Sequence, residues 1–316
     1  GERYQTADYL RGLYYAVLEG RFLFEFIYQE DLPTATLSKY RALLLPNAAY
    51  LRDGECEAIR RYVARGGSLW ATFETSRYNE WGDPREDLAL ADVFGASLAG
   101  DVVGPAGNSY MRIERPHALT RNFQRTSLLP GPEYRLHVRG HRAGLPELTV
   151  VPAYPAFPPE MVYPRTPRTE EPAALLSETG GSRVVYFPGD VDRTFWRSGN
   201  TDLSQLIRNS VTWVMGEAEP LLTVEGDGVI EMFLWETDAG FALHVLNYTN
   251  PQMTRPFVRG FYPAGPFSVS LMLPGARRVS EVRTLRTPTT LSYRLEGGRV
   301  RFVLPKVTDY EIVALV

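Results

Sequence analysis

The sequence predicts an α/β domain built on a parallel sheet, followed by an antiparallel β-sandwich. Two observations lead to this prediction. Between residues 40 and 73 a short apolar run, an amphipathic segment and a second apolar run follow one another, as in a β-α-β unit. After Glu217 the chain holds only short apolar runs separated by Gly, Pro, Asp or Asn, which is typical of a sandwich. We therefore expect domains at 1–217 and 218–316.

The β-α-β unit carries a signal at each boundary. Ala42–Leu45 is apolar and unbroken, as expected of a strand buried on both faces of a parallel sheet. Asp53 can cap the next helix, and Gly66-Gly67 supplies a left-handed stop. Ser68–Phe73 is then the second strand. The helix should bury one face, formed at spacings of three and four by Cys56, Ile59, Tyr62 and Val63.

Four further elements complete the expected α/β domain: strands at Phe22–Tyr28 and Arg183–Phe187, and helices at Asp87–Phe94 and Asp202–Met215. The chain opens in a helix whose expected apolar stripe is Leu10, Leu13, Tyr14, Val17 and Leu18.

Residues 100–180 are rich in Pro and Gly, and prolines cannot join a central ladder. We interpret this segment as a surface insertion that covers one edge of the sheet. The C-terminal domain should hold about eight strands. Their expected ranges are Leu221–Val224, Val229–Trp235, Phe241–Asn247, Phe267–Leu273, Arg277–Leu285, Thr290–Leu295, Val300–Leu304 and Tyr310–Val316.

Composition excludes several classes of function. The chain has 316 residues, a net charge of −3 and one cysteine. The sequence has no cluster of positive charge that would bind nucleic acid, and no apolar stretch of about 20 residues that would span a membrane. A single cysteine excludes an intramolecular disulfide, and the scattered histidines lack the spacing of a zinc site. No phosphate loop or dinucleotide fingerprint occurs. We therefore expect no metal, no cofactor, and neither a nucleic-acid nor a membrane partner.

The stretch around Gly66-Gly67 resembles a known family. A strand ending in a proline turn, a polar helix ending YV..GG and a following strand resemble the β-galactosidase trimerisation domain. That domain is the flavodoxin-like, glutamine-amidotransferase-like middle domain of family forty-two glycoside hydrolases. The resemblance covers about the first two thirds of the chain, and its other segments are FLFEFIYQEDL, DLALADVFGASLAG, GGSRVVYFPGDVDRTFW and DLSQLIRNSVTWVMG.

The resemblance implies self-association, most simply as a trimer, with loops lent to the rim of a neighbouring subunit's sugar pocket. The loop Glu74–Trp81 and the segment PAYPAFPPEMVYPRTPRTEEP are the expected contributors. A flavodoxin-like strand that should precede the first helix is missing, so we expect a piece of a longer polypeptide, whose compartment the sequence does not predict.

One departure from amidotransferases excludes their chemistry. Their nucleophile is a Cys at the tight turn after the strand that corresponds to Ser68–Phe73, where this chain has Glu74-Thr75-Ser76. The only cysteine, Cys56, falls on the apolar side of a helix, as expected of an inert buried thiol.

Candidate site residues follow two strands of the expected sheet, because ligands of open α/β sheets bind beyond the carboxyl ends of the strands. The first loop offers Glu74, Arg77, Asn79, Glu80 and Trp81, a mixture suited to a sugar. The second loop offers Asp190, Asp192, Arg193 and Trp196. If that loop is extended, the two aspartates point to opposite sides.

Two interpretations of these residues remain open. In the functional one, Glu74 or Glu80 pairs with Asp190 or Asp192 as acid and base. In the structural one, which we favour, the second loop makes only local turns, ion pairs and packing. The family's catalytic glutamates lie on a separate TIM barrel, which would need roughly 250 residues and is not present here.

We therefore name no catalytic residue. The expected function is a non-catalytic, oligomerising and active-site-shaping portion of a glycoside-hydrolase-like protein in carbohydrate metabolism. The alternative is a free-standing carbohydrate-binding protein or small hydrolase that uses the carboxylates of the crevice.

Overall fold

The computed structural model describes residues 6–33, 36–250, 260–273 and 279–316. Contacts divide the chain into two compact units. The first holds the residues up to Ala16 together with Phe26–Glu217, and the second holds Val17–Glu25 together with Ala218–Val316. Each unit has its own hydrophobic core.

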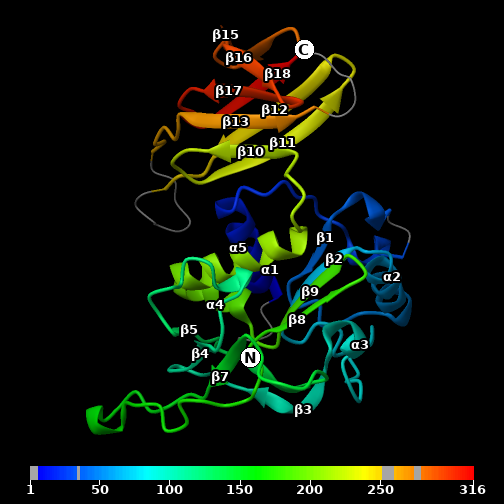
Figure 1. Ribbon diagram of the computed structural model, residues 1–316, viewed down its shortest axis with the longest axis vertical. Helices are drawn as coiled ribbons and strands as arrows, with labels where there is room; N and C mark the ends of the chain where they lie inside the picture. Colours follow the sequence, from blue (N-terminus) through cyan, green and yellow to red (C-terminus); the bar gives the residue numbers. More distant parts are fainter. Residues whose placement is uncertain (1–5, 34–35, 251–259, 274–278) are drawn as a thin grey trace. The chain divides into compact units, whose positions relative to one another are not determined.

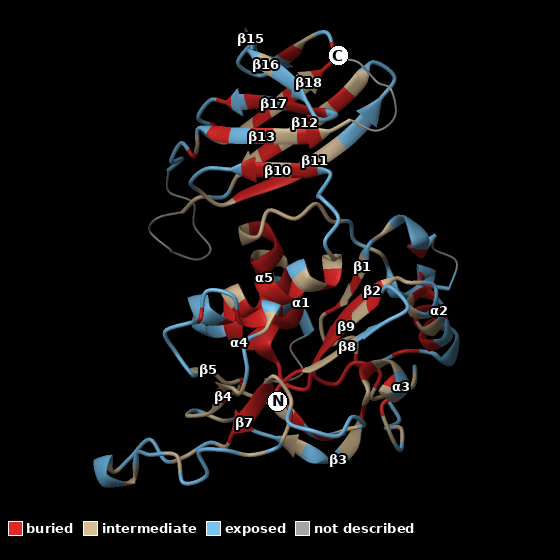
Figure 2. Ribbon diagram, in the orientation of Figure 1, coloured by how far each residue is buried: buried red, intermediate tan, exposed pale blue. Residues whose placement is uncertain are grey.

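The first unit is built on a mixed four-stranded sheet in the order β1-β2-β9-β8 (Figure 1). The strands are β1 (Ala42–Leu45), β2 (Ser68–Thr72), β9 (Ser182–Phe187) and β8 (Leu175–Thr179). The first three run parallel, and β8 joins β9 in the antiparallel sense. All five residues of β2 are buried, and Figure 2 shows β2 and β9 as the buried centre of this sheet. The predicted β-α-β unit is present.

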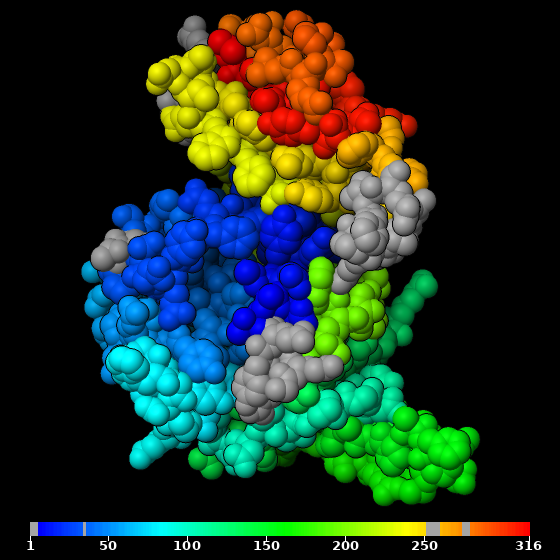
Figure 3. Space-filling view, turned by 180° about the vertical axis from the view of Figure 1, so that it is seen from behind, coloured from blue at the N-terminus to red at the C-terminus, as the bar shows by residue number. Residues whose placement is uncertain are grey.

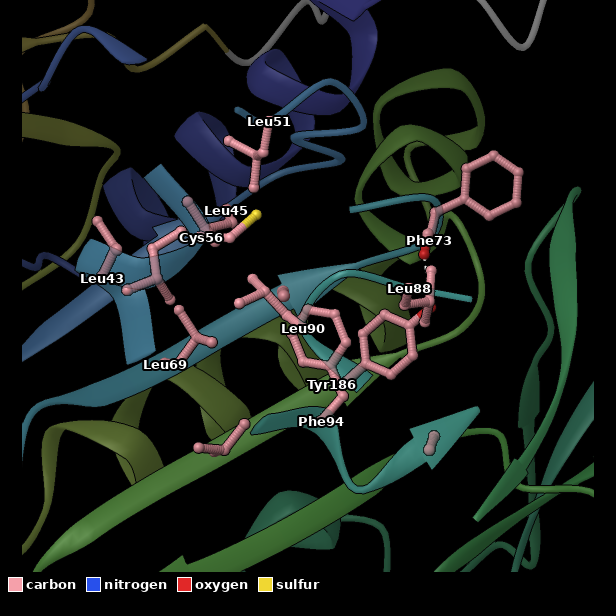
Figure 4. Packing of buried hydrophobic residues seen from close by; sticks show 14 of the residues in the cluster. Leu43, Leu45, Leu51, Cys56, Leu69, Phe73, Leu88, Leu90, Phe94 and Tyr186 are labelled. Atoms are coloured by element: carbon pink, nitrogen blue, oxygen red, sulfur yellow. Dashed lines mark hydrogen bonds between the residues drawn. The ribbon is translucent and has the colours of Figure 1, made fainter. Parts of the chain in front are cut away.

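Helices cover both faces of this sheet. On one face, α2 (Asp53–Ala64) and α3 (Ala91–Phe94) pack against β2 and β9, as the close view in Figure 4 shows. Phe94 stacks on Tyr186 with ring centroids 4.2 Å apart. On the other face, Trp70 of β2 donates its indole N–H to Ser210 of α5 (Thr201–Met215) over 2.8 Å. Asn200 caps α5, as its side chain accepts from two backbone N–H groups of the first turn.

Several expected elements differ from the structure. Phe22–Tyr28 forms no strand, because its apolar side chains divide between the two cores. Leu23 packs in the second unit and Ile27 in the first. The expected helix from Asp87 is only α3, since the Asp87 carboxylate instead accepts from the backbone N–H groups of residues 88 and 98.

The first helix, α1 (Thr6–Glu19), buries Leu13, Val17 and Leu18 of the expected apolar stripe, but not Leu10 and Tyr14. Leu10 is 45% exposed and Tyr14 is only half-buried. The buried positions Tyr9, Leu13, Ala16 and Val17 are the ones that follow the helical period from residue 9.

The segment after Pro188 also differs from the expected extended loop, because it forms α4 (Val191–Ser198). The Asp190 carbonyl accepts the Thr194 N–H at 2.8 Å, which closes the first turn. Gly199, with φ of 66°, ends the helix in the left-handed conformation.

The insertion between β2 and β9 folds into small sheets. One is the ribbon of β3 (Ala96–Val103) and β6 (Arg135–Gly140). The other has the order β5-β4-β7, formed by β5 (Leu128–Pro130), β4 (Tyr110–Ile113) and β7 (Leu148–Val151). The insertion also supplies β8, which covers the β9 edge of the main sheet. The proline-rich residues 152–172 project from this unit as an arm, visible from both sides in Figures 1 and 3.

The second unit contains two antiparallel sheets that enclose one core, as in a β-sandwich. The first sheet, in the order β10-β13-β17-β16, consists of β10 (Leu222–Glu225), β13 (Phe267–Met272), β17 (Arg299–Leu304) and β16 (Tyr293–Glu296). The second, in the order β11-β12-β18-β14-β15, consists of β11 (Ile230–Thr237), β12 (Gly240–Asn247), β18 (Tyr310–Leu315), β14 (Val282–Thr284) and β15 (Thr289–Thr290).

Three features of the second unit depart from the expectation. The expected strand Thr290–Leu295 divides into β15 and β16, which belong to different sheets. The expected strand Arg277–Leu285 shortens to β14, and its first two residues lie outside the described part of the chain. Residues 17–25 contribute to this unit, since Arg21 donates to the carbonyls of Val224 (2.9 Å) and Gly228 (3.0 Å).

Candidate functional site

The carboxyl ends of β1 and β2 are held by three residues in the left-handed region: Asn47 (φ 46°), Phe73 (φ 51°) and Ser76 (φ 66°). The Asn47 N–H donates to Thr72 Oγ1 at 2.9 Å, and the Asn47 side chain accepts from the Glu74 N–H at 3.0 Å. Non-glycine residues adopt this conformation only where the surroundings impose it. These turns direct Glu74 inward, where its carboxylate accepts from the Tyr78 hydroxyl at 2.8 Å and only 2% of the residue is exposed.

The first turn of α4 brings three more predicted residues to the same edge. Asp190, Asp192 and Arg193 are all fully buried. Arg193 Nη1 donates to Asp190 Oδ2 at 2.8 Å and to Glu133 Oε2 at 2.6 Å. Asp190 Oδ1 also accepts from the backbone N–H of Tyr134 and from the Thr194 hydroxyl, each at 2.9 Å. Its charged form is therefore balanced by a cation and two neutral donors.

Among the residues that the structure describes, no cation lies within hydrogen-bond distance of the Asp192 carboxylate. This carboxylate accepts from the Thr72 hydroxyl and from the Arg193 backbone N–H, each at 2.9 Å. Burial raises the pKa of Asp192 to about 7, and the nearby Asp190 charge adds to the rise. Burial also raises the pKa of Asp190 to about 7, against the opposing effect of Arg193. The two buried carboxyl groups interact, so they titrate as a pair near neutral pH.

Helix α1 covers the cluster. Tyr9 is fully buried and stacks on Phe73 with ring centroids 6.1 Å apart. Burial, together with the charges of Asp190 and Asp192, holds the pKa of Tyr9 well above its ordinary value. A Cβ on Gly12 would lie 1.9 Å from the Asp192 carbonyl oxygen, so the two backbones are in direct contact. In an open α/β sheet this edge is where a ligand binds. In this protein helix α1 occupies that edge of the sheet.

We call Tyr9, Glu74, Glu133, Asp190, Asp192 and Arg193 the acid cluster. Glu74, Asp190, Asp192 and Arg193 were candidates from the sequence. Tyr9 and Glu133 were missed. Nothing in the sequence marks Glu133, which the insertion carries to the site. Tyr9 could have been found from the helical period that it shares with Leu13 and Ala16.

The remaining candidates do not join the acid cluster. Arg77 binds the backbone carbonyl of Arg85, and Asn79 closes a turn with Asp83. Glu80 and Trp81 point to solvent, and Trp81 is 83% exposed. Trp196 packs against Tyr15, with ring centroids 5.2 Å apart, and lies under the Arg11 guanidinium. The candidate set thus separates into a buried group and an exposed loop.

Two further kinds of site, a metal centre and a reactive thiol, concern other residues in the described part of the chain. No group of three or more His, Cys, Asp or Glu side chains there could hold a metal ion. None of its helices is long and apolar enough to cross a membrane. Cys56 is buried beside Leu43 and Leu45 (Figure 4), and burial raises the pKa of its thiol to about 11. Such a thiol is unreactive at neutral pH.

Comparison with known proteins identifies the class of fold. No family model and no curated protein matches the sequence. Among solved structures, α-L-fucosidase isoenzyme 2 from Paenibacillus thiaminolyticus is similar over 96% of this chain and 44% of its own, with 18% identity and a TM-score of 0.71. The β-galactosidase from Bacillus circulans sp. alkalophilus is similar over 100% of this chain and 38% of its own, with 16% identity and a TM-score of 0.64.

A GH42 β-galactosidase from G. stearothermophilus, Gan42B, is similar over 99% of this chain and 37% of its own, at 15% identity and a TM-score of 0.60. Identities this low establish the fold alone. The chain therefore has a glycoside-hydrolase-like fold, and it spans less than half the length of each of these three proteins.

Proposed function

We propose that this chain is the non-catalytic, oligomerising and active-site-shaping portion of a β-galactosidase-like glycoside hydrolase. The observation that carries the proposal is the extent of the structural likeness. At least 96% of this chain aligns with less than half of a fucosidase and of two β-galactosidases. The part of those enzymes that it resembles is thus a minor portion of each chain.

The first unit, in this proposal, is a flavodoxin-like trimerisation domain of the glutamine-amidotransferase type. The backbone after β2 supports this. Phe73 takes the left-handed conformation at a sharp turn directly before Glu74-Thr75-Ser76, the segment that stands where amidotransferases have their nucleophile. An aromatic side chain stands there, its ring stacked on Tyr9, and Glu74 follows it. The turn geometry is present without a nucleophile, which fits a structural descendant of an enzyme fold.

Exposed aromatics support self-association. Trp81 is 83% exposed, and Tyr78 of the same loop stacks on the exposed Tyr50 with ring centroids 5.2 Å apart. On the arm, Phe157 is 79% exposed and Tyr163 is 53% exposed. Interface cores concentrate aromatic residues and arginine, and such residues carry much of the binding energy. We propose that these two segments contact neighbouring copies in a trimer and border a neighbour's sugar pocket.

The mass of the chain in solution tests this proposal. Sedimentation of the chain at roughly tens of micromolar should give a trimer. Trp81→Ala and Phe157→Ala should each weaken association at least about tenfold, because hot-spot truncations cost 2 kcal/mol or more. Leu295→Ala, which truncates an exposed side chain on β16, is the matched control and should leave the mass unchanged. A chain that stays monomeric, alone and within its full polypeptide, would exclude oligomerisation.

The rival, a free-standing carbohydrate-binding protein or small hydrolase, has one observation in its favour. Glu74, Asp190 and Asp192 do gather at the edge where α/β enzymes bind substrates. Against it, helix α1 fills that edge and Arg193 balances the charge. Aryl-galactosides and aryl-fucosides should therefore be hydrolysed no faster than background. Turnover that Glu74→Gln or Asp190→Asn abolishes would establish the rival and refute a non-catalytic role.

A further inference from the structure

The first unit has a hollow of about 550 Å³ that shares no residue with the acid cluster. Its walls are residues 137–140 of β6, the loop 142–147, the start of β8 and residues 170–172. This volume lies within the usual range of small-molecule sites, roughly 300 to 1,000 Å³. None of the candidate site residues from the sequence analysis lies here, although residues 170–172 are the end of the proline-rich segment 152–172.

Alternation along β6 gives the hollow its polar wall. Leu136 and Val138 point into the core, which leaves His137 and Arg139 exposed on the opposite face. Opposite β6, the loop 142–147 is anchored at two points. Arg115 donates to Glu147 at 2.8 Å and to the Leu145 carbonyl at 2.9 Å, and Arg142 Nη1 donates to the Leu176 carbonyl of β8 at 3.3 Å. The walls are therefore held by specific contacts.

The lining holds three arginines and three glutamates, but the ion pairs leave a positive excess. Glu147 pairs with Arg115, and Glu171 pairs with Arg135 outside the hollow. Among the residues that the structure describes, neither Arg139 nor Arg142 has an acidic partner. The one unpaired carboxylate in the lining is the exposed Glu170. Two guanidinium groups against one carboxylate leave a positive site, and its apolar lining includes Leu175, Leu176 and Pro146.

We propose that this hollow binds a small organic anion, whose carboxylate, sulfate or phosphate group is held by Arg139 and Arg142. A guanidinium group is planar, and it can donate two parallel hydrogen bonds to the oxygens of such an anion. The apolar lining contacts the body of the ligand, which the volume limits to about the size of a mono- or disaccharide. Anion binding at this site requires neither catalysis nor self-association. The site and the proposed function are therefore tested by separate experiments.

Calorimetric titration tests the proposal with glucuronate, glucose 6-sulfate and glucose 6-phosphate, and with glucose as the uncharged control. We expect the anions to bind, glucose not to bind, and affinity to fall as salt rises, because the contact is partly exposed. Arg139→Gln and Arg142→Gln should each weaken binding at least about tenfold, the scale of one charge-assisted hydrogen bond. Preference among the three anions identifies the group that the site takes, and any such preference supports the proposal.

Arg125→Gln is the matched control, since Arg125 is exposed in the same unit and does not line the hollow. It should bind like the parent chain. Circular dichroism melts should show all three variants folded, as they alter only exposed side chains. The proposal is overturned if none of the anions binds, if glucose binds equally well, or if both substitutions in the hollow leave the affinity unchanged.

Discussion

The acid cluster and the arginine-lined hollow are two polar regions of one unit, and they satisfy their charges in opposite ways. In the acid cluster, carboxylates and a guanidinium bind each other, and helix α1 excludes solvent from them. In the hollow, two arginines face an open surface without an acidic partner among the described residues. A polar cluster that the protein satisfies internally serves the fold, whereas one that it leaves unsatisfied and open is available to a ligand. Residue type alone does not distinguish the two.

The largest expected effect comes from removing the cation of the acid cluster. Arg193→Met leaves Asp190 and Glu133 without the guanidinium that binds both. Breaking a buried pair by removing one partner costs about 3–5 kcal/mol. Denaturant unfolding of the full chain should show this loss in the transition of the first unit. Arg125→Met, at an exposed site, should change stability by less than about 0.5 kcal/mol. An equally small effect of Arg193→Met would mean that the cluster is open to water.

A smaller loss should follow from a methyl group placed between α1 and α4. In Gly12→Ala the new Cβ would lie 1.9 Å from the Asp192 carbonyl oxygen, so the backbones must separate. Overpacking of this kind costs about 1–3 kcal/mol. Hydrogen exchange should show faster exchange at the first turn of α4.

Gly54→Ala is the matched control for that substitution. Gly54 also lies within a helix, and a Cβ there meets nothing within 4 Å. The replacement should stabilise the chain by up to about 1 kcal/mol. If Gly12→Ala proved as harmless as Gly54→Ala, α1 would not be packed on the acid cluster.

Local periodicity was enough to predict the β-α-β unit, β9 and α5, since each carries its own boundary signals. Phe22–Tyr28 was mistaken for a strand because its apolar residues serve two cores, and sequence does not show which core a residue joins. Four candidates do meet at the sheet edge, because strand ends in a parallel sheet must converge. Three features depend on packing between segments far apart in the sequence, so a local sequence pattern does not predict them. They are the contact of Tyr9 and Gly12 with the acid cluster, the ion pair of Glu133 with Arg193, and the hollow.

The smallest of the three effects concerns the proton balance of the acid cluster. Burial raises the pKa of Asp192 from 3.8 to about 7, so between these values the folded chain holds a proton that the unfolded chain has released. The Asp192 contribution therefore favours folding most below about pH 4, weakens as the pH rises to about 7 and is constant above. Asn carries no charge, so Asp192→Asn should gain stability relative to the parent as the pH rises from about 5 to 8. One pKa unit corresponds to about 1.4 kcal/mol, and water penetration reduces the full effect to about 1–2 kcal/mol.

Melting temperatures of both proteins across this range measure the difference, with the exposed Asp101→Asn as the control that should show none. A pH-independent difference between Asp192→Asn and the parent would mean that Asp192 stays ionised in the fold, and Arg193 would then balance both aspartates rather than Asp190 alone.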